Sequence, residues 1–143
     1  MKLLKRIAVA SLAVILLLLF TACKYSIPRE EAVQRAESFA LAISEARYED
    51  AAELMHPSRE TSPSDLKMYF TATEKDYGVS FAGFTIESYT GEKSSAHNTL
   101  YEGGYYELTC KASAGDRTFE FRIEIVQNEY GYGIHNFHFD FSE

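Results

Sequence analysis

The hydrophobic pattern of this chain changes its period near residue 80. Before that point apolar residues recur every three or four positions, as in an amphipathic helix, and after it they alternate with polar residues, as in a half-buried strand. The clearest strand is TFEFRIEIV, in which Glu120, Arg122 and Glu124 form the polar face. The apolar face consists of Phe119, Phe121, Ile123 and Ile125. Helices followed by antiparallel strands with one solvent-exposed face predict an α+β domain.

The first helix is expected to have Ser26 as its cap and Pro28 in its first turn, and to end near Ala46. One face of this helix is apolar and consists of Val33, Ala36, Phe39, Ala40 and Ile43. A short second helix over residues 48–55 is closed at His56, because the proline that follows disfavours helical geometry there.

The third helix carries clear signals at both ends. Ser62 is its expected cap, Pro63 takes the first helical position, and Asp65 completes a capping box. Gly78 is the expected end. The predicted buried face consists of Leu66, Tyr69, Phe70 and Thr73.

Three further segments alternate as strands do. They are FTIESY (84–89), YYELTCKA (105–112) and GIHNFHFDF (133–141). The second of them pairs with TFEFRIEIV across the turn SAGDR. In the last, Ile134 is out of phase with the phenylalanines that follow, so a β-bulge is expected near His135 or Asn136. These phenylalanines are Phe137, Phe139 and Phe141.

The N-terminus has the three parts of an export signal. A basic start is followed by an apolar run over residues 7–20 and by the small residues Thr21 and Ala22. The run is shorter than the roughly 20 residues that a membrane-spanning helix needs, so cleavage is favoured over a permanent span. The tetrad Phe20-Thr21-Ala22-Cys23 resembles the lipobox of bacterial lipoproteins, in which the cysteine thiol is lipidated and becomes the first mature residue.

The lipobox resemblance implies a chain in three parts. Residues 1–22 are a signal peptide, residues 23–27 are the lipidated Cys23 and a short tether, and residues 28–143 are the folded domain. The implied location is extracytoplasmic, with the N-terminal lipid anchoring the protein to a bacterial cell membrane. The alternative is an ordinary secreted protein in which a cysteine happens to follow the signal.

Charge excludes one class of partner. All 21 acidic residues but only 11 of the 14 basic residues follow Cys23, so the mature part carries a net charge of −10. Such a domain is not expected to bind nucleic acid through phosphate contacts. We also expect repulsion from anionic headgroups, which predicts a domain that stands off the membrane surface.

The second cysteine, Cys110, is expected to be inert. Lipidation of Cys23 leaves it without a disulfide partner, and it alternates in phase with Leu108 and Ala112 on one strand face. A buried free cysteine behaves as a small hydrophobic residue. No histidine or asparagine context marks it as an activated nucleophile.

The order of these elements resembles the small NTF2-like, or cystatin-like, lipoproteins of bacteria over residues 28–141. The likeness rests on the first helix and on the segments EARYEDAAELMHP, DYGVSFAGFTIES and YGIHNFHF. It implies a cone-shaped domain whose long helix packs in the concave face of a curved antiparallel sheet. Many members of this group have no assigned activity.

Ketosteroid isomerase and scytalone dehydratase share that architecture, so a cavity enzyme of the isomerase or dehydratase type is the alternative function. Such catalysis needs a carboxylate or imidazole inside the cavity. His138 and Asp140 share one face of the last strand and are the alternative catalytic pair. The phenylalanine face is the better candidate for the core, so no catalytic residue is assigned.

The remaining histidines indicate neither a metal nor a cofactor site. His135 and His138 are three residues apart, a spacing that does not bring two side chains together on a regular strand. His56, before a proline, and His97, in a polar segment, are expected to be solvated loop residues.

Tyrosines are the remaining candidates for binding. Five of them gather around glycines: Tyr101, Tyr105, Tyr106, Tyr130 and Tyr132. Tyrosines in such loops can anchor a protein or glycan partner, but tyrosine is also common in strands. The favoured function is a non-catalytic, membrane-anchored domain that binds an envelope protein, a glycan or a small-molecule ligand.

Overall fold

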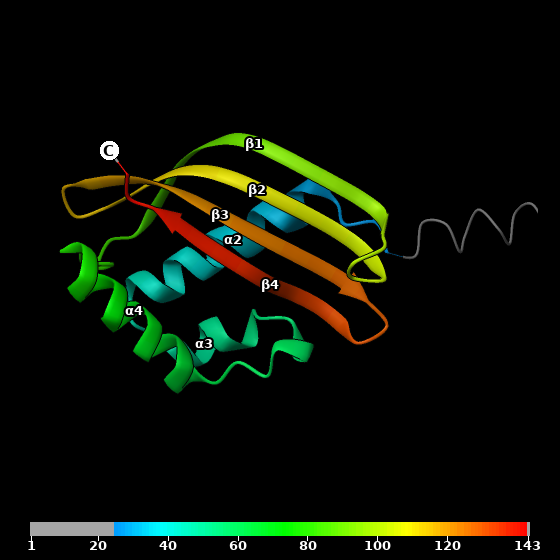
Figure 1. Cartoon of the computed structure of the whole chain (residues 1–143), viewed down its shortest axis with the longest axis horizontal. Helices are drawn as coiled ribbons and strands as arrows, with labels where there is room; N and C mark the ends of the chain where they lie inside the picture. The colour runs from blue at the N-terminus through cyan, green and yellow to red at the C-terminus, as the bar shows by residue number, and fades with distance from the viewer. Residues whose placement is uncertain (1–24, 143) are drawn as a thin grey trace, which may run out of the picture.

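The computed structural model describes residues 25–142, whose arrangement is shown in Figure 1. Helices come first and an antiparallel sheet follows, which confirms the predicted α+β class. The helical elements are α2 (Arg29–Ser44), α3 (Tyr48–Glu53), the 3-10 helix η1 (Pro57–Arg59) and α4 (Pro63–Tyr77). The strands are β1 (Thr85–Asn98), β2 (Gly103–Ala114), β3 (Arg117–Asn128) and β4 (Gly131–Asp140). None of the described helices is long and apolar enough to cross a membrane.

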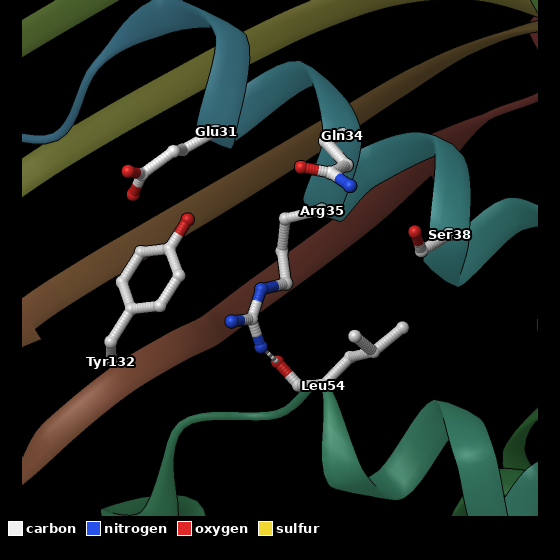
Figure 2. Close-up of a pocket in the computed structure, with 6 residues that line it drawn as sticks. All are labelled: Glu31, Gln34, Arg35, Ser38, Leu54 and Tyr132. Atoms are coloured by element: carbon white, nitrogen blue, oxygen red, sulfur yellow. Dashed lines mark hydrogen bonds between the residues drawn. The ribbon is translucent and has the colours of Figure 1, made fainter.

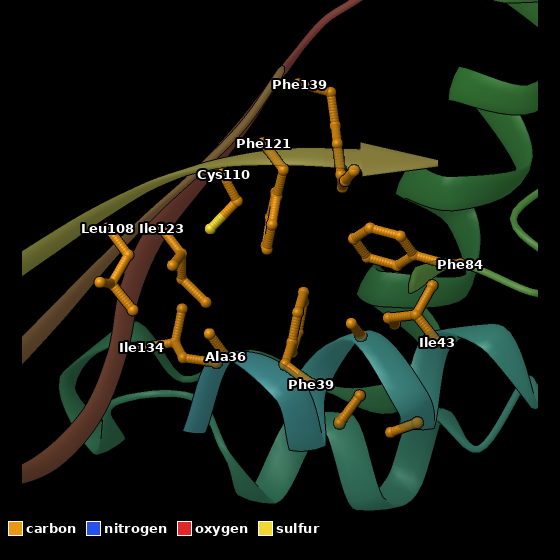
Figure 3. Packing of buried hydrophobic residues seen from close by; sticks show 14 of the residues in the cluster. Ala36, Phe39, Ile43, Phe84, Leu108, Cys110, Phe121, Ile123, Ile134 and Phe139 are labelled. Carbon is orange, nitrogen blue, oxygen red and sulfur yellow. The ribbon is translucent and has the colours of Figure 1, made fainter. Parts of the chain in front are cut away.

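The sheet is a meander in which strands that follow one another in the chain also pair, in the order β1-β2-β3-β4. It curves over α2, and the helices lie on its concave side (Figure 1). The predicted alternation is confirmed on β3, where the four apolar side chains are buried. Of these, Phe121 and Ile123 face α2 together with Leu108 and Cys110 of β2 (Figure 3).

Phe39 of α2 lies at the centre of the core. Its ring stacks on Phe121 of β3, with centroids 6.5 Å apart and planes 7° apart. Phe137 of β4 packs against the same ring at 5.0 Å, and Phe70 of α4 packs against it at 6.2 Å. Figure 3 shows Phe39, Phe121 and Phe139 pointing into the same space between α2 and the sheet. Side chains therefore fill the concave side.

The helix ends follow the sequence signals in part. The capping box of α4 is confirmed, since Ser62 and Asp65 bond each other's backbone N–H, and Gly78 ends the helix in the left-handed region at φ 62°. The predicted cap of the first helix is wrong: Pro28 takes the cap position of α2, without a side-chain hydrogen bond. Tyr69, assigned to the buried face of α4, is exposed.

Irregular pairing adjusts which side chains face the core. The bulge predicted in the last strand is confirmed at His135, because Asn136 pairs with Glu124 while Ile134 pairs with Ile125. The bulge allows Ile134 and the later phenylalanines to face the same side. β1 is longer than the sequence indicated and carries irregularities after Ile86 and Tyr89. The exposed His97 lies in this strand, which corrects its assignment to a loop.

The end of α3 is joined to the edge strand β4 through the backbone. The Ile134 N–H donates to the Leu54 carbonyl at 2.9 Å, and the His56 N–H donates to the Ile134 carbonyl at 2.8 Å. Met55 and Ile134 form a parallel bridge between these two bonds. The close approach needs a residue without a side chain at Gly133, where an added Cβ would lie 2.6 Å from the His56 nitrogen. We call this contact the α3–β4 junction.

We predict that Gly133→Ala destabilises the domain by about 1–3 kcal/mol, the usual cost of forcing extra volume into a packed site. The Cβ would meet the backbone between Met55 and His56, which cannot rotate away as a side chain can. Gly91→Ala is the matched control, because its Cβ would make ordinary contact with Thr109 at 3.4 Å. The control should stay within about 1 kcal/mol of wild type in urea unfolding. Equal midpoints for the two variants would show that the junction contributes little.

Candidate functional site

The five candidate tyrosines lie in different places on the domain. Tyr101 and Tyr105 stack with centroids 5.5 Å apart and planes 8° apart. Their hydroxyls donate to Glu124 at 3.1 Å and to Glu107 at 2.9 Å. Because Tyr105 alternates with the buried Tyr106, this pair lies on the face that points away from α2, here called the outer face. Burial, followed by the nearby carboxylates, raises the pKa of both hydroxyls.

Tyr106 is a core residue. It is buried, and its hydroxyl donates to Glu92 at 2.6 Å, while Glu92 also accepts from Arg29 at 2.6 Å. Burial and the hydrogen bond to Glu92 raise the pKa of Tyr106 to about 12. These contacts tie the start of α2 to β1. We therefore assign Tyr106 to packing, which was one of its two sequence interpretations.

Tyr132 lines a surface groove of about 410 Å³ between α2, the end of α3 and β4 (Figure 2). The residues that line the groove are Glu31, Gln34, Arg35, Ser38, Leu54 and Tyr132. The Arg35 guanidinium lies over the Tyr132 ring at 4.3 Å from the centroid, a cation–π contact. One of its nitrogens donates to the Leu54 carbonyl at 3.2 Å.

The groove has unused donor capacity. The Tyr132 hydroxyl is buried, and within residues 25–142 it has no hydrogen-bond partner. Burial raises the pKa of Tyr132, and the positive charge of Arg35 opposes that rise. A buried polar group without a partner costs about 1–3 kcal/mol. The Arg35 guanidinium keeps donors beyond the one bonded to Leu54, so the groove can recognise a carbonyl or carboxylate group at Arg35.

The fifth tyrosine, Tyr130, is exposed in the turn between β3 and β4. Its backbone N–H donates to the Asn128 side chain at 3.0 Å, which holds the turn. The five tyrosines thus form no single cluster. They make an outer pair, a core residue, a groove residue and a turn residue.

His56 is buried, with 1% of its surface exposed, so its assignment to a solvated loop is wrong. Its Nδ1 accepts from the Ser58 N–H at 3.2 Å, and its Nε2 lies 3.1 Å from both the Asn128 side-chain oxygen and the Gly131 carbonyl. Because both Nε2 partners are acceptors, the tautomer that fits these contacts carries its proton on Nε2. His56 therefore fastens the segment before η1 to the β3–β4 hairpin.

His135 lies close to His56. Its ring centroid is 4.6 Å from that of Tyr101 and 6.0 Å from that of His56. Burial, then the charge of Arg59 and the neighbouring His56, lower the pKa of His135 below its ordinary value. The surroundings thus favour the neutral imidazole.

The alternative catalytic pair lies away from the concave side. His138 and Asp140 are both exposed and alternate with the buried Phe139 on β4. Asp140 accepts hydrogen bonds from the Ser142 hydroxyl and from the Ser142 backbone N–H, and these bonds lower its pKa. His138 pairs in register with Arg122 on the outer face. Among residues 25–142, no group of three or more potential ligands is placed to hold a metal ion.

The structure describes one of the two cysteines, Cys110. Cys110 is free and completely buried, as predicted, and burial raises the pKa of its thiol to about 12. Such a thiol is protonated at neutral pH and is a poor nucleophile. Cys23, the predicted lipidation site, lies outside the described residues.

Sequence reasoning did not identify Arg35 as a site residue. Arg35 and Tyr132 are far apart in the chain, and no local motif links them. The one available signal was the position of Arg35 on α2 one residue before the buried Ala36, at the margin of the apolar face. That position predicts a cation at the edge of the core, without indicating which strand it meets.

Comparisons of the chain with protein-family models, with curated proteins and with solved structures found no match.

We predict that the domain loses stability as the pH falls from 7.5 to 5.5, and that His135→Gln reduces this loss. The folded-state pKa of His135 is below the ordinary value of about 6.5, so in this range the unfolded chain binds a proton that the folded chain does not. The free energy of unfolding therefore decreases as the pH drops through that window. Urea unfolding at both pH values measures the effect.

The matched control is His97→Gln, which replaces an exposed histidine of β1. It should lose as much stability between pH 7.5 and 5.5 as the wild type does. Equal losses in wild type and His135→Gln would contradict the assignment.

Proposed function

We propose that this protein is an extracytoplasmic lipoprotein, anchored to a bacterial cell membrane through Cys23, whose domain is a non-catalytic binding module. The anchor is supported by the basic start, the apolar run and the lipobox-like tetrad that ends at Cys23. The folded domain begins soon after this cysteine, because α2 starts at Arg29. The tether is therefore short.

We further propose that the domain is NTF2-like, or cystatin-like. In support of this, the long helix α2 lies along the concave face of a curved antiparallel sheet. The shorter helices α3 and α4 lie on the same side of the sheet (Figure 1).

The observation that carries the binding proposal is the packing of the concave side. Enzymes built on this architecture hold substrate between the sheet and its helices, where a general acid or base meets it. Here that space is occupied by aromatic rings, with Phe39 in contact with Phe70, Phe121 and Phe137. The pair that would serve as acid and base, His138 and Asp140, is exposed on the outer face. Both features favour recognition at the surface over chemistry in a cavity.

The groove beside Arg35 and Tyr132 is the best-supported place for a ligand. It offers a guanidinium and the polar side chains of Gln34 and Ser38. Glu31 at its rim adds a negative charge, so a ligand that carries both a carboxylate and an amine would match the groove better than a simple anion. A small molecule or the end of a peptide from the envelope has this chemistry.

We predict that Cys23→Ser releases the protein from the membrane fraction. The physical reason is that each buried CH₂ of an acyl chain contributes about 0.8 kcal/mol, so that two or three chains give stable attachment. Fractionation of cells, combined with labelling by a fatty-acid analogue, measures the effect on the full chain. Wild-type protein should take up label and Cys23→Ser should not.

Cys110→Ser provides the matched control, since it replaces the other cysteine and should keep both the label and the membrane location. A wild-type chain that takes up no label would contradict the lipid anchor. Cys23→Ser protein that stays in the membrane fraction would contradict it equally.

A further inference from the structure

The described chain begins at one end of the sheet. A Cβ on Gly104 would overlap the carbonyl oxygen of Tyr25, so the start of the chain lies directly against the first residues of β2. In the sheet, Gly104 pairs with Gln127, near the end of β3. The start of the chain, the β1–β2 turn and the β3–β4 turn therefore lie at the same end of the domain, and the β2–β3 turn lies at the opposite end (Figure 1).

Each turn at this end presents a large apolar or aromatic side chain to solvent. Leu100 in the β1–β2 turn is 77% exposed, and Tyr130 in the β3–β4 turn is 62% exposed. Both turns are held by an asparagine: Asn98 accepts from the Leu100 N–H at 3.0 Å, and Asn128 accepts from the Tyr130 N–H. Leu100 and Tyr130 are therefore displayed from ordered positions. We call them the two tip residues.

We propose that the two tip residues contact the lipid interface of the membrane that anchors the protein. This inference rests on the proposed lipid anchor at Cys23, which precedes Tyr25 by two residues. Two residues of chain reach at most about 7 Å, so an anchored Cys23 holds this end of the domain at the membrane surface. Tyrosine is enriched at membrane interfaces and leucine partitions into the hydrocarbon, so both side chains suit that environment.

A second copy of the chain is a less suitable occupant of this surface. A stable protein interface buries about 800 Å² on each partner, whereas one tyrosine buries about 150–250 Å² and a leucine buries no more. Two separate tip residues do not supply the required area. A membrane needs no matching area, because the lipid anchor already holds the two surfaces together.

Charge sets the depth of the contact. Glu102 and Glu129 lie in the two turns, and the mature chain carries a net charge of −10. These carboxylates keep the contact at headgroup level and disfavour anionic lipids. Charge alone predicted a domain that stands off the membrane surface, and the proposed contact replaces that expectation. With the short lipid anchor holding this end at the surface, the repulsion from anionic headgroups limits how deeply the tips insert.

The experiment uses the full lipidated chain, reconstituted in phosphatidylcholine vesicles. A nitrobenzoxadiazole probe is attached at one introduced cysteine at a time, in Leu100→Cys, Tyr130→Cys and Asp116→Cys. Asp116 is the matched control, because it is exposed in the β2–β3 turn at the opposite end. Thermal unfolding checks that each labelled protein is folded, and Cys110 is too buried to take up the probe.

We expect a headgroup-level lipid quencher to reduce the signal at positions 100 and 130 at least twofold more than at position 116. Quenching at the two tips should be weaker when phosphatidylglycerol replaces part of the phosphatidylcholine. Equal quenching at all three positions would overturn the inference. A blue-shifted tip signal without lipid quenching would also overturn it, because a second copy of the chain would then cover the tips.

The Cys23→Ser chain, run in parallel, separates this inference from the anchor on which it rests. If the wild type binds vesicles through Cys23 and the tips stay unquenched, the tip contact is wrong and the anchor stands. If the wild type and Cys23→Ser bind the vesicles equally, the anchor is wrong, and equal quenching at positions 100, 130 and 116 would then overturn the tip contact as well.

Discussion

The contact between Phe39 of α2 and the concave face of the sheet is the interaction on which the rest of the structure depends. Its ring meets Phe121 of β3 and Phe137 of β4, so one side chain joins the long helix to two neighbouring strands. Phe70 packs on the same ring and brings α4 into the core. Because this cluster fills the concave side, we place the proposed recognition on other surfaces. The Arg35–Tyr132 groove and the two tip residues both lie outside the cluster.

The α3–β4 junction fixes the helical half to the last hairpin. Two backbone bonds to Ile134 and the buried ring of His56 hold the end of α3 against β4. The same junction forms one wall of the groove, since Leu54 both accepts from Ile134 and lines that groove beside Arg35. Loosening the junction would therefore disturb the groove as well as the fold. Gly133 is required there because the two backbones approach closely.

Local chemistry made much of the fold predictable, and long-range contacts limited the rest. The alternation of Phe121 with its polar neighbours, the capping box at Ser62 and the bulge at His135 each depend on residues close in sequence. The burial of His56 depends on Asn128 and Gly131, which lie more than 70 residues away, so a proline-flanked histidine gave no sign of it. The groove was missed for the same reason. The tyrosines were found by their glycine neighbours, but glycines do not indicate which face of the sheet each side chain occupies.

The space between α2 and the sheet is filled, and on this we base the proposal that the protein binds at its surface rather than acting on a substrate inside. Diffraction from wild-type crystals under xenon pressure tests this claim most directly, because xenon enters apolar cavities that protein atoms leave open. We predict no xenon site among the rings of Phe39, Phe121 and Phe137. An ordered xenon atom at that position would reveal an open cavity. It would contradict the proposed surface-binding function and favour the alternative, a cavity enzyme of the isomerase or dehydratase type.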